Sequence, residues 1–172
     1  MKKLLVLLMA FALLLCACAS GGGEPTKPEE ISVGNQTLSY KDSAEKFVNC
    51  GFKRFASYQE LAESTPEPDK AILANEDGDV RAIFFTDKQL TSYQGISVGD
   101  NFQKVRDSFE NVNETENQLH VLFNVKTGES FDPKTTSISE NDWLVIQYNS
   151  INADGTISGI SIYDFIFSQH RQ

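Results

Sequence analysis

Two stretches of this 172-residue chain share one local plan, and that plan limits the folds open to it. The phrase Ile-Ser-Val-Gly occurs at residues 31–34 and again at residues 96–99. Asp42 and Asp100 follow these phrases, and each opens a capping-box pattern in which the aspartate accepts a backbone N–H while the third residue reaches back. We therefore predict a helix after each aspartate, in the same place in both halves.

Each half also ends on a matching strand that follows an Asp-Gly pair. Residues 77–87 line up with residues 154–164, so that Ile83 corresponds to Ile160. Asp-Gly between β-prone runs predicts a hairpin, because both residues tolerate a positive φ. A calcium loop is the weaker interpretation, since neither stretch has acids at the first and twelfth loop positions. Duplication explains the match, although any helix-plus-hairpin unit also needs such caps and turns.

The alternation of apolar residues predicts six strands, at residues 37–40, 71–75, 80–86, 119–125, 143–149 and 157–166. A short helix is expected after Ser57, whose spacing to Glu60 is again that of a capping box. Helices followed by hairpin-linked strands favour an α+β fold. We expect tandem helix-plus-antiparallel-hairpin repeats that form a β-sheet with helices on one face. This single domain covers residues 31–172, in two related halves of about 31–94 and 95–172.

The N-terminus has the pattern of a secretory signal. Lys2 and Lys3 precede an apolar run at residues 4–15, which is shorter than the roughly 20 residues that a transmembrane helix needs. The run ends in Leu-Cys-Ala-Cys, which resembles the bacterial lipobox, where the final cysteine is lipidated and becomes the first residue of the mature chain. The expected cleavage therefore lies between Ala17 and Cys18.

The lipobox resemblance implies a lipoprotein with a signal peptide at residues 1–17 and acyl chains, such as palmitate, on Cys18. Such chains would hold the protein on the extracytoplasmic face of the cell membrane. Ala19 is not an aspartate, so in a cell with two membranes the outer membrane is the alternative location. Residues 18–30 contain glycines and prolines without apolar periodicity, which predicts that the lipidated cysteine is followed by a flexible tether.

Net charge argues against two classes of partner. Cleavage after Ala17 removes two lysines and no acid, which leaves 13 basic and 24 acidic residues and a net charge of −11. That charge repels phosphate backbones and anionic headgroups. We therefore expect contact with the membrane only through the N-terminal lipid, and no binding of nucleic acid.

The sequence holds no recognisable catalytic, metal or cofactor motif. His120 and His170 lack metal-ligand spacing to another histidine or cysteine, and no glycine-rich phosphate loop or nucleophile elbow occurs. With Cys18 lipidated, Cys50 has no disulfide partner, and we expect it to act as a small buried hydrophobe at a helix end, with a reactive thiol as the alternative. The expectation is a protein without cofactor, metal or enzymatic activity.

The last predicted strand carries apolar residues on both faces. Ile160 and Ile162 lie on one face, and Tyr163 and Phe165 lie on the other. Few helices are predicted, so covering both faces of the sheet is difficult. Tyr163, Phe165 and Trp143 are therefore the candidate binding surface. The alternative is that these rings fill a small second core.

Residues 95–105, Gly-Ile-Ser-Val-Gly-Asp-Asn-Phe-Gln-Lys-Val, resemble a signature of small bacterial envelope proteins. The tandem plan is similar to the β-lactamase-inhibitor-protein-like and SmpA/OmlA-type folds, in which a helical unit packs on an antiparallel sheet. The resemblance implies a protein that binds an envelope or secreted protein. The chain departs from the inhibitor, which is freely secreted and has disulfides, so no contact residue is carried over.

From these features we expect a non-catalytic, membrane-anchored protein-binding module. A scaffold or assembly accessory of an envelope complex is the alternative. A small-ligand receptor or an enzyme is the weaker option.

Overall fold

The computed structural model describes residues 23–136, 139, 142–151 and 154–164. Its elements in chain order are β1 (Glu30–Val33), β2 (Gln36–Ser39), α2 (Ala44–Asn49), β3 (Lys53–Phe55), α3 (Tyr58–Ala62), β4 (Lys70–Ala74), β5 (Val80–Phe85), β6 (Leu90–Ser92), the 3-10 turn η2 (Tyr93–Gly95), β7 (Ile96–Ser97), α4 (Phe102–Ser108), β8 (Asn113–Thr115), β9 (Gln118–Asn124), β10 (Trp143–Asn149) and β11 (Gly159–Asp164). The α-helices have only five to seven residues each, so the described chain is mostly sheet. The expected α+β class is thus too rich in helix, while its antiparallel sheet is confirmed.

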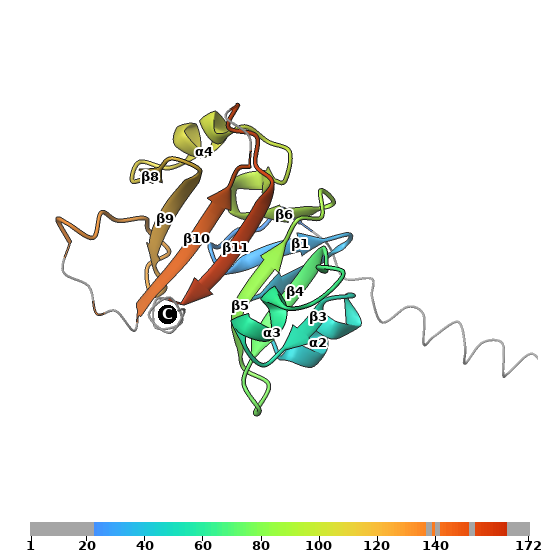
Figure 1. Ribbon diagram of the computed structural model, residues 1–172. Coiled ribbons are helices and arrows are strands. Elements are labelled where there is room, and N and C mark those ends of the chain that lie inside the picture. The colour runs from blue at the N-terminus through green and yellow to red at the C-terminus, as the bar shows by residue number, and fades with distance from the viewer. Residues whose placement is uncertain (1–22, 137–138, 140–141, 152–153, 165–172) are drawn as a thin grey trace, which may run out of the picture.

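Two sheets make up the fold. Seven strands form the larger sheet in the order β3-β4-β5-β11-β10-β9-β8, and four form the smaller sheet in the order β2-β1-β6-β7. Neighbouring strands are antiparallel except for β3 and β4. In the view of Figure 1, the smaller sheet crosses behind the larger one and α3 lies in front of it. We call the face toward the smaller sheet the inner face, and the opposite one the outer face.

The main core lies on the inner face. One row across the larger sheet consists of paired residues that are fully buried, namely Ile72, Ile83, Ile162, Ile146 and Val121. The smaller sheet packs on this core through Ile31 and Leu38, while α2 and α4 contribute Phe47 and Val105. Burying each such large side chain stabilises the fold by about 1.5–3 kcal/mol. The inner face is therefore closed to solvent.

A second, smaller core covers part of the outer face. Leu61 of α3 and Phe131 of the segment after β9 pack over Leu73, Val145 and Tyr163 of the sheet. Because α3 lies on this face while α2 and α4 join the inner core, helices occupy both faces of the sheet. The expectation of helices on one face only is wrong, since the aromatic outer residues need a cover of their own.

Helices α2 and α4 each dock on the Asp-Gly turn of their own half. The backbone N–H of Ala44 donates to the carbonyl of Gly78 at 2.9 Å, and that of Phe102 donates to the carbonyl of Gly155 at 2.8 Å. Both glycines have positive φ angles, +89° and +71°, as the predicted turns require. The same helix-to-turn contact thus occurs in both halves.

The side chains of the two aspartates before the helices accept hydrogen bonds from backbone N–H groups three residues earlier in the chain. Asp42 accepts the N–H of Ser39 at 2.7 Å, and Asp100 accepts the N–H of Ser97 at 2.8 Å. The N-cap positions are residues 43 and 101, one residue later than predicted, and the predicted capping boxes at Asp42 and Asp100 are wrong. The turn carbonyls already accept the first free N–H of each helix, which leaves the aspartates to close the preceding strand.

The shared Ile-Ser-Val-Gly phrase occupies different places in the two halves. Residues 31–34 form β1 and enter its turn to β2, whereas residues 96–99 form β7 and lead directly to Asp100. By its contact with Asp100, Ser97 corresponds to Ser39, which lies in β2. The phrase matches because both places need a short β-prone run followed by a glycine with positive φ.

The long strands agree with the sequence predictions. The strand predicted at residues 143–149 is confirmed, and four others, β2, β4, β5 and β9, lie within one residue of their predicted bounds. The short helix after Ser57 is also confirmed, with the Ser57 hydroxyl accepting the N–H of Glu60 at 3.2 Å. Part of the predicted tether differs, because Pro25, Pro28 and Glu29 are buried against the body. The signal peptide and Cys18 lie outside the described residues.

Candidate functional site

A groove opens on the outer face where the two halves meet. Here β5 pairs with β11, and one row across the sheet runs Ala71, Phe84, Ser161, Gln147. Small and large side chains alternate along this row. Because Ser161 is small and stands between Phe84 and Gln147, it leaves a hollow, and the cavity there has a volume of about 330 Å³.

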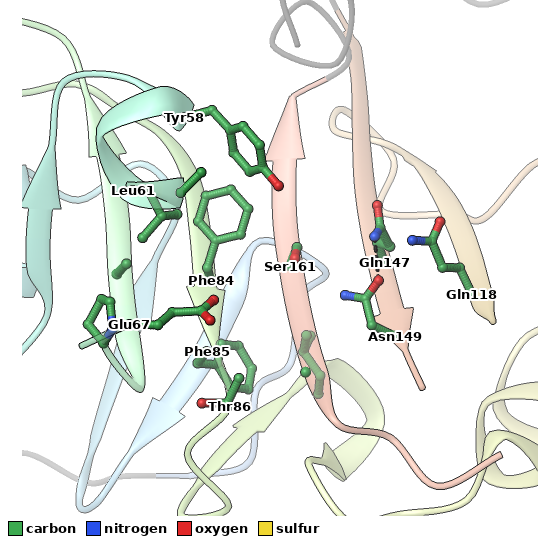
Figure 2. Close-up of a pocket in the computed structure, with 15 residues that line it drawn as sticks. Tyr58, Leu61, Glu67, Phe84, Phe85, Thr86, Gln118, Gln147, Asn149 and Ser161 are labelled. Atoms are coloured by element: carbon green, nitrogen blue, oxygen red, sulfur yellow. Dashed lines mark hydrogen bonds between the residues drawn. The ribbon is translucent and has the colours of Figure 1, made fainter. Parts of the chain in front are cut away.

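The two walls of the groove differ in chemistry. Figure 2 shows Tyr58, Phe84 and Glu67 on one side of Ser161, and Gln147, Asn149 and Gln118 on the other. The first wall comes from α3, β5 and the loop between α3 and β4. The second wall comes from β10 and β9. We refer to them as the aromatic wall and the amide wall.

A chain of hydrogen bonds fixes the orientation of the amide wall. The buried Tyr163 hydroxyl donates to Gln147 Oε1 at 2.9 Å, and Gln147 Nε2 donates to Asn149 Oδ1 at 2.5 Å. A carboxamide has one acceptor end and one donor end. Because Asn149 uses its oxygen toward Gln147, its Nδ2 is the end left to donate to an occupant. Tyr163 thus acts on the groove from beneath.

The aromatic wall consists of two rings in contact. The ring centroids of Tyr58 and Phe84 are 6.2 Å apart, with the ring planes inclined by 48°. Tyr58 is 45% exposed, and Phe84 is half-buried. Such a pair gives this wall apolar area and the charge distribution of aromatic rings.

Among the described residues that line the groove, Glu67 is the only charged one. It is exposed, and within the described residues its carboxylate has no ion pair or hydrogen bond. Glu67 stands between Pro66 and Pro68. Proline fixes its own φ and restricts the residue before it, so the backbone that carries this carboxylate has little freedom.

Two of the three aromatic residues predicted from the sequence, Tyr163 and Trp143, lie elsewhere on the outer face. Tyr163 is only 5% exposed and belongs to the second core. Trp143 is half-buried and packs edge-on against Phe131, with ring centroids 5.2 Å apart. Phe165 lies outside the described residues. Tyr163 therefore contributes no exposed ring, because α3 and the segment after β9 cover that end of the sheet.

Cys50 occupies the end of α2, as its C-cap residue. Its side chain is half-buried against the main core, and Sγ donates to Gln36 Oε1 at 3.4 Å. The predicted place at a helix end is confirmed, whereas the predicted burial is only partial. Ala17 and Cys18, the predicted cleavage and lipidation residues, fall outside the described residues.

Sequence reasoning missed most of the groove. One signal was present, because Gln147 and Asn149 break the apolar pattern of β10 at alternate positions and so share a face. Gln118 lies on the neighbouring strand opposite Asn149. No pattern in the sequence marks Glu67, whose place depends on how the loop after α3 returns to the sheet.

Among the described residues, no three histidine, cysteine or acidic side chains gather as potential metal ligands. None of the helices in that part of the chain is both long and apolar enough to span a bilayer. No protein-family model matches the chain, and neither curated proteins nor solved structures give a significant match.

Proposed function

We propose that this protein is a lipid-anchored extracytoplasmic lipoprotein that binds another envelope or secreted protein and catalyses no reaction. The groove on the outer face carries the proposal. It combines an exposed aromatic ring with carboxamides, and both side-chain types are common in surfaces that recognise proteins. The hydrogen-bonded amide wall is oriented before a partner arrives, which lowers the entropy lost on binding.

A duplicated origin fits this proposal. We infer that the two halves descend from one helix-plus-hairpin unit, in the manner of the β-lactamase-inhibitor-protein-like and SmpA/OmlA-type folds. The support is the recurrence of the helix-to-turn bonds at Gly78 and Gly155 and of the aspartate bonds at Asp42 and Asp100.

Site-specific crosslinking tests the partner. A photoreactive residue is placed at Thr86, which is exposed on the groove lining, in the full lipoprotein in its own cells. We expect a discrete crosslinked protein that disappears when Ser161→Leu fills the hollow. The matched control carries the probe at Glu45, which is exposed on α2.

Circular dichroism of Ser161→Leu verifies that this variant is folded. A product that persists in the folded Ser161→Leu protein would refute the groove as the binding site. The groove is likewise refuted if Thr86 gives no product beyond those seen from Glu45.

The anchor has its own test. Replacing Cys18 with serine removes the thiol that receives the lipid, so the protein should move from the membrane fraction to the soluble fraction. Several acyl chains bind a bilayer far more firmly than a folded acidic surface does. Retention of Cys18→Ser at the membrane, or an unmodified N-terminus by mass spectrometry, would contradict the lipoprotein proposal.

A further inference from the structure

The groove has a chemical polarity from one wall to the other. On the aromatic side, the carboxylate of Glu67 lies next to Phe84, and Tyr58 lies on the other side of that ring (Figure 2). On the amide side, the hydrogen-bond chain from Tyr163 leaves Asn149 Nδ2 as a donor. An occupant that satisfies both sides must carry a cation at one end and a hydrogen-bond acceptor at the other.

Among the described residues that line the groove, none is basic, so no lining side chain neutralises Glu67. The mature chain as a whole is strongly acidic, with 13 basic and 24 acidic residues after cleavage at Ala17. An anionic ligand would meet repulsion from Glu67 and from the surrounding charge. A purely apolar ligand would bury this carboxylate without a partner, which is costly.

We propose that the groove receives an arginine side chain of the partner protein. The inference rests on the proposed function and adds to it the chemistry of recognition. A planar guanidinium stacks on aromatic rings and also pairs with a carboxylate. With the guanidinium between Glu67 and the Phe84 ring, the main-chain carbonyl of the same arginine accepts from Asn149 Nδ2.

Arginine fits these walls better than lysine does. A guanidinium is flat and weakly hydrated, so it can lie against Tyr58 and Phe84 while its edge donates to Glu67. An ammonium is compact and strongly hydrated, and it has no face to stack. The aromatic pair therefore favours a flat group, and Glu67 favours a positively charged one.

Ligand-observed saturation-transfer NMR tests the inference with the mature lipoprotein in nanodiscs. The probe is the capped pentapeptide Gly-Gly-Arg-Gly-Gly, and its matched control replaces arginine by the neutral isostere citrulline. We expect saturable binding of the arginine peptide, with the citrulline peptide about tenfold weaker because it loses both the ion pair and the cation–π contact. A lysine peptide should bind more weakly than the arginine peptide.

Two exposed acids give a matched pair of variants. Glu67→Gln should weaken binding of the arginine peptide about fivefold, which is the effect expected from the loss of an accessible ion pair. Glu63→Gln should leave binding unchanged, because Glu63 is exposed at the end of α3, accepts from Gln59 and does not line the groove. Phe84→Leu should weaken binding of the arginine peptide, but this variant should still bind the arginine peptide more tightly than the citrulline peptide.

Several results would overturn the inference: no binding of the arginine peptide, equal binding of the citrulline or lysine peptide, or equal effects of the two glutamate variants. The proposed function fails separately. If the partner crosslinked at Thr86 is captured equally well by Glu67→Gln, the binding module stands and the arginine inference falls. If Thr86 captures no specific partner, the module itself is wrong.

Discussion

The two halves of the domain share their scaffold contacts and differ where they meet. Both dock a helix on an Asp-Gly turn, and both close the strand before the helix with an aspartate. At the seam between β5 and β11, however, the first half places Phe84 and the second half places Ser161. The aromatic wall comes from one half and the amide wall from the other. Shared backbone contacts thus set the frame, and unlike side chains at the seam make the site.

The register between β5 and β11 stays the same when each residue is replaced by its counterpart in the other half. Ile83 corresponds in sequence to Ile160, and Phe85 corresponds to Ile162. Ile83 pairs with Ile162, while Ile160 pairs with Phe85, so exchanging the halves reproduces the register. Phe84 and Ser161 correspond to each other and also pair with each other. A change at this single pair therefore makes the groove asymmetric without altering the backbone.

The largest expected effect separates the two turn glycines. A Cβ added at Gly155 would lie 3.5 Å from Phe102 Cβ, whereas one at Gly78 would have open space around it. Gly155→Val should cost about 3 kcal/mol in the free energy of unfolding, from the positive φ and from crowding against Phe102. Gly78→Val should cost about 1–2 kcal/mol from φ alone.

Urea denaturation of both valine variants measures the difference. Equal losses in the free energy of unfolding would contradict the close contact between Phe102 of α4 and the turn at Gly155.

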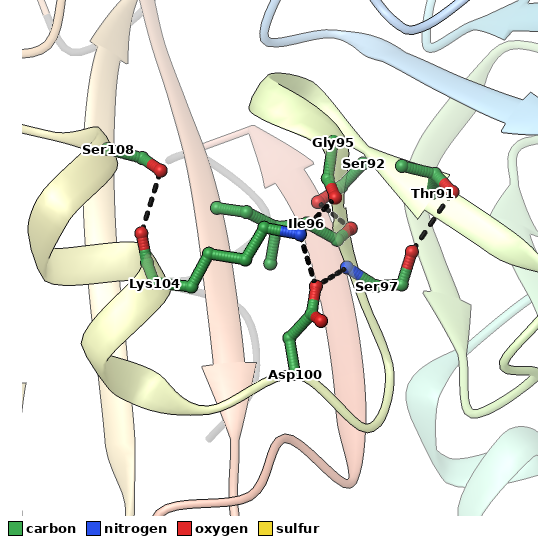
Figure 3. Close-up of polar contacts among 8 residues, drawn as sticks. All are labelled: Thr91, Ser92, Gly95, Ile96, Ser97, Asp100, Lys104 and Ser108. Atoms are coloured by element: carbon green, nitrogen blue, oxygen red, sulfur yellow. Dashed lines mark hydrogen bonds and ion pairs between the residues drawn. The ribbon is translucent and has the colours of Figure 1, made fainter.

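The second prediction concerns the aspartates. In Figure 3, Asp100 Oδ2 accepts from the Ser97 N–H at 2.8 Å and from Lys104 Nζ at 2.8 Å. Burial by itself raises the pKa of Asp100, but the bonds from Lys104 and Ser97 and the lysine charge outweigh it, so the pKa lies below the ordinary 3.8. Asp100→Asn should cost about 1 kcal/mol at pH 7.

The sign of the pH dependence follows from the lowered pKa. The stabilisation by Asp100 is complete above the ordinary pKa of 3.8 and is lost as the pH falls through the lower folded-state pKa. Thermal unfolding of wild type and Asp100→Asn should therefore converge at strongly acid pH. Asp42→Asn is the matched variant, and its cost at pH 7 should agree within about 0.5 kcal/mol if the two motifs are equivalent.

These paired positions also show what the sequence could predict. Strands of five to seven residues, such as β4, β9 and β10, have enough apolar alternation to be recognised. Strands of two or three residues, such as β3 and β7, are too short to show an alternation, although β7 pairs with β6 only a few residues before it. The groove was missed because its walls join α3, β5, β9, β10 and a loop.

The smallest expected effect concerns a buried tyrosine of the second half. Tyr148 is fully buried, and although the Ser92 side chain lies near its hydroxyl, among the described residues this hydroxyl has no hydrogen bond of normal distance and angle. Removing an unsatisfied hydroxyl costs little, so Tyr148→Phe should change the free energy of unfolding by less than about 0.5 kcal/mol. Tyr148 pairs with Ile160, which corresponds to Ile83 of the first half. The residue paired with Ile83 is Ile72, which has no polar group that needs a hydrogen bond.

Tyr163→Phe is the control, because the Tyr163 hydroxyl does donate, to Gln147 Oε1. This variant should lose about 1 kcal/mol by the same measurement. A loss at Tyr148 as large as that at Tyr163 would show that the Tyr148 hydroxyl has a partner after all.

The buried prolines Pro25 and Pro28 shorten the tether that would link this domain to the lipid. With Pro25 packed against the body, only residues 19–24 separate Cys18 from the fold. Fully extended, these six residues reach at most about 20 Å. The chain enters through the smaller sheet, whereas the groove opens on the opposite side of the larger one. A lipid at Cys18 would therefore keep the body close to the bilayer and favour orientations in which the groove looks sideways or outward, toward proteins passing just above the headgroups.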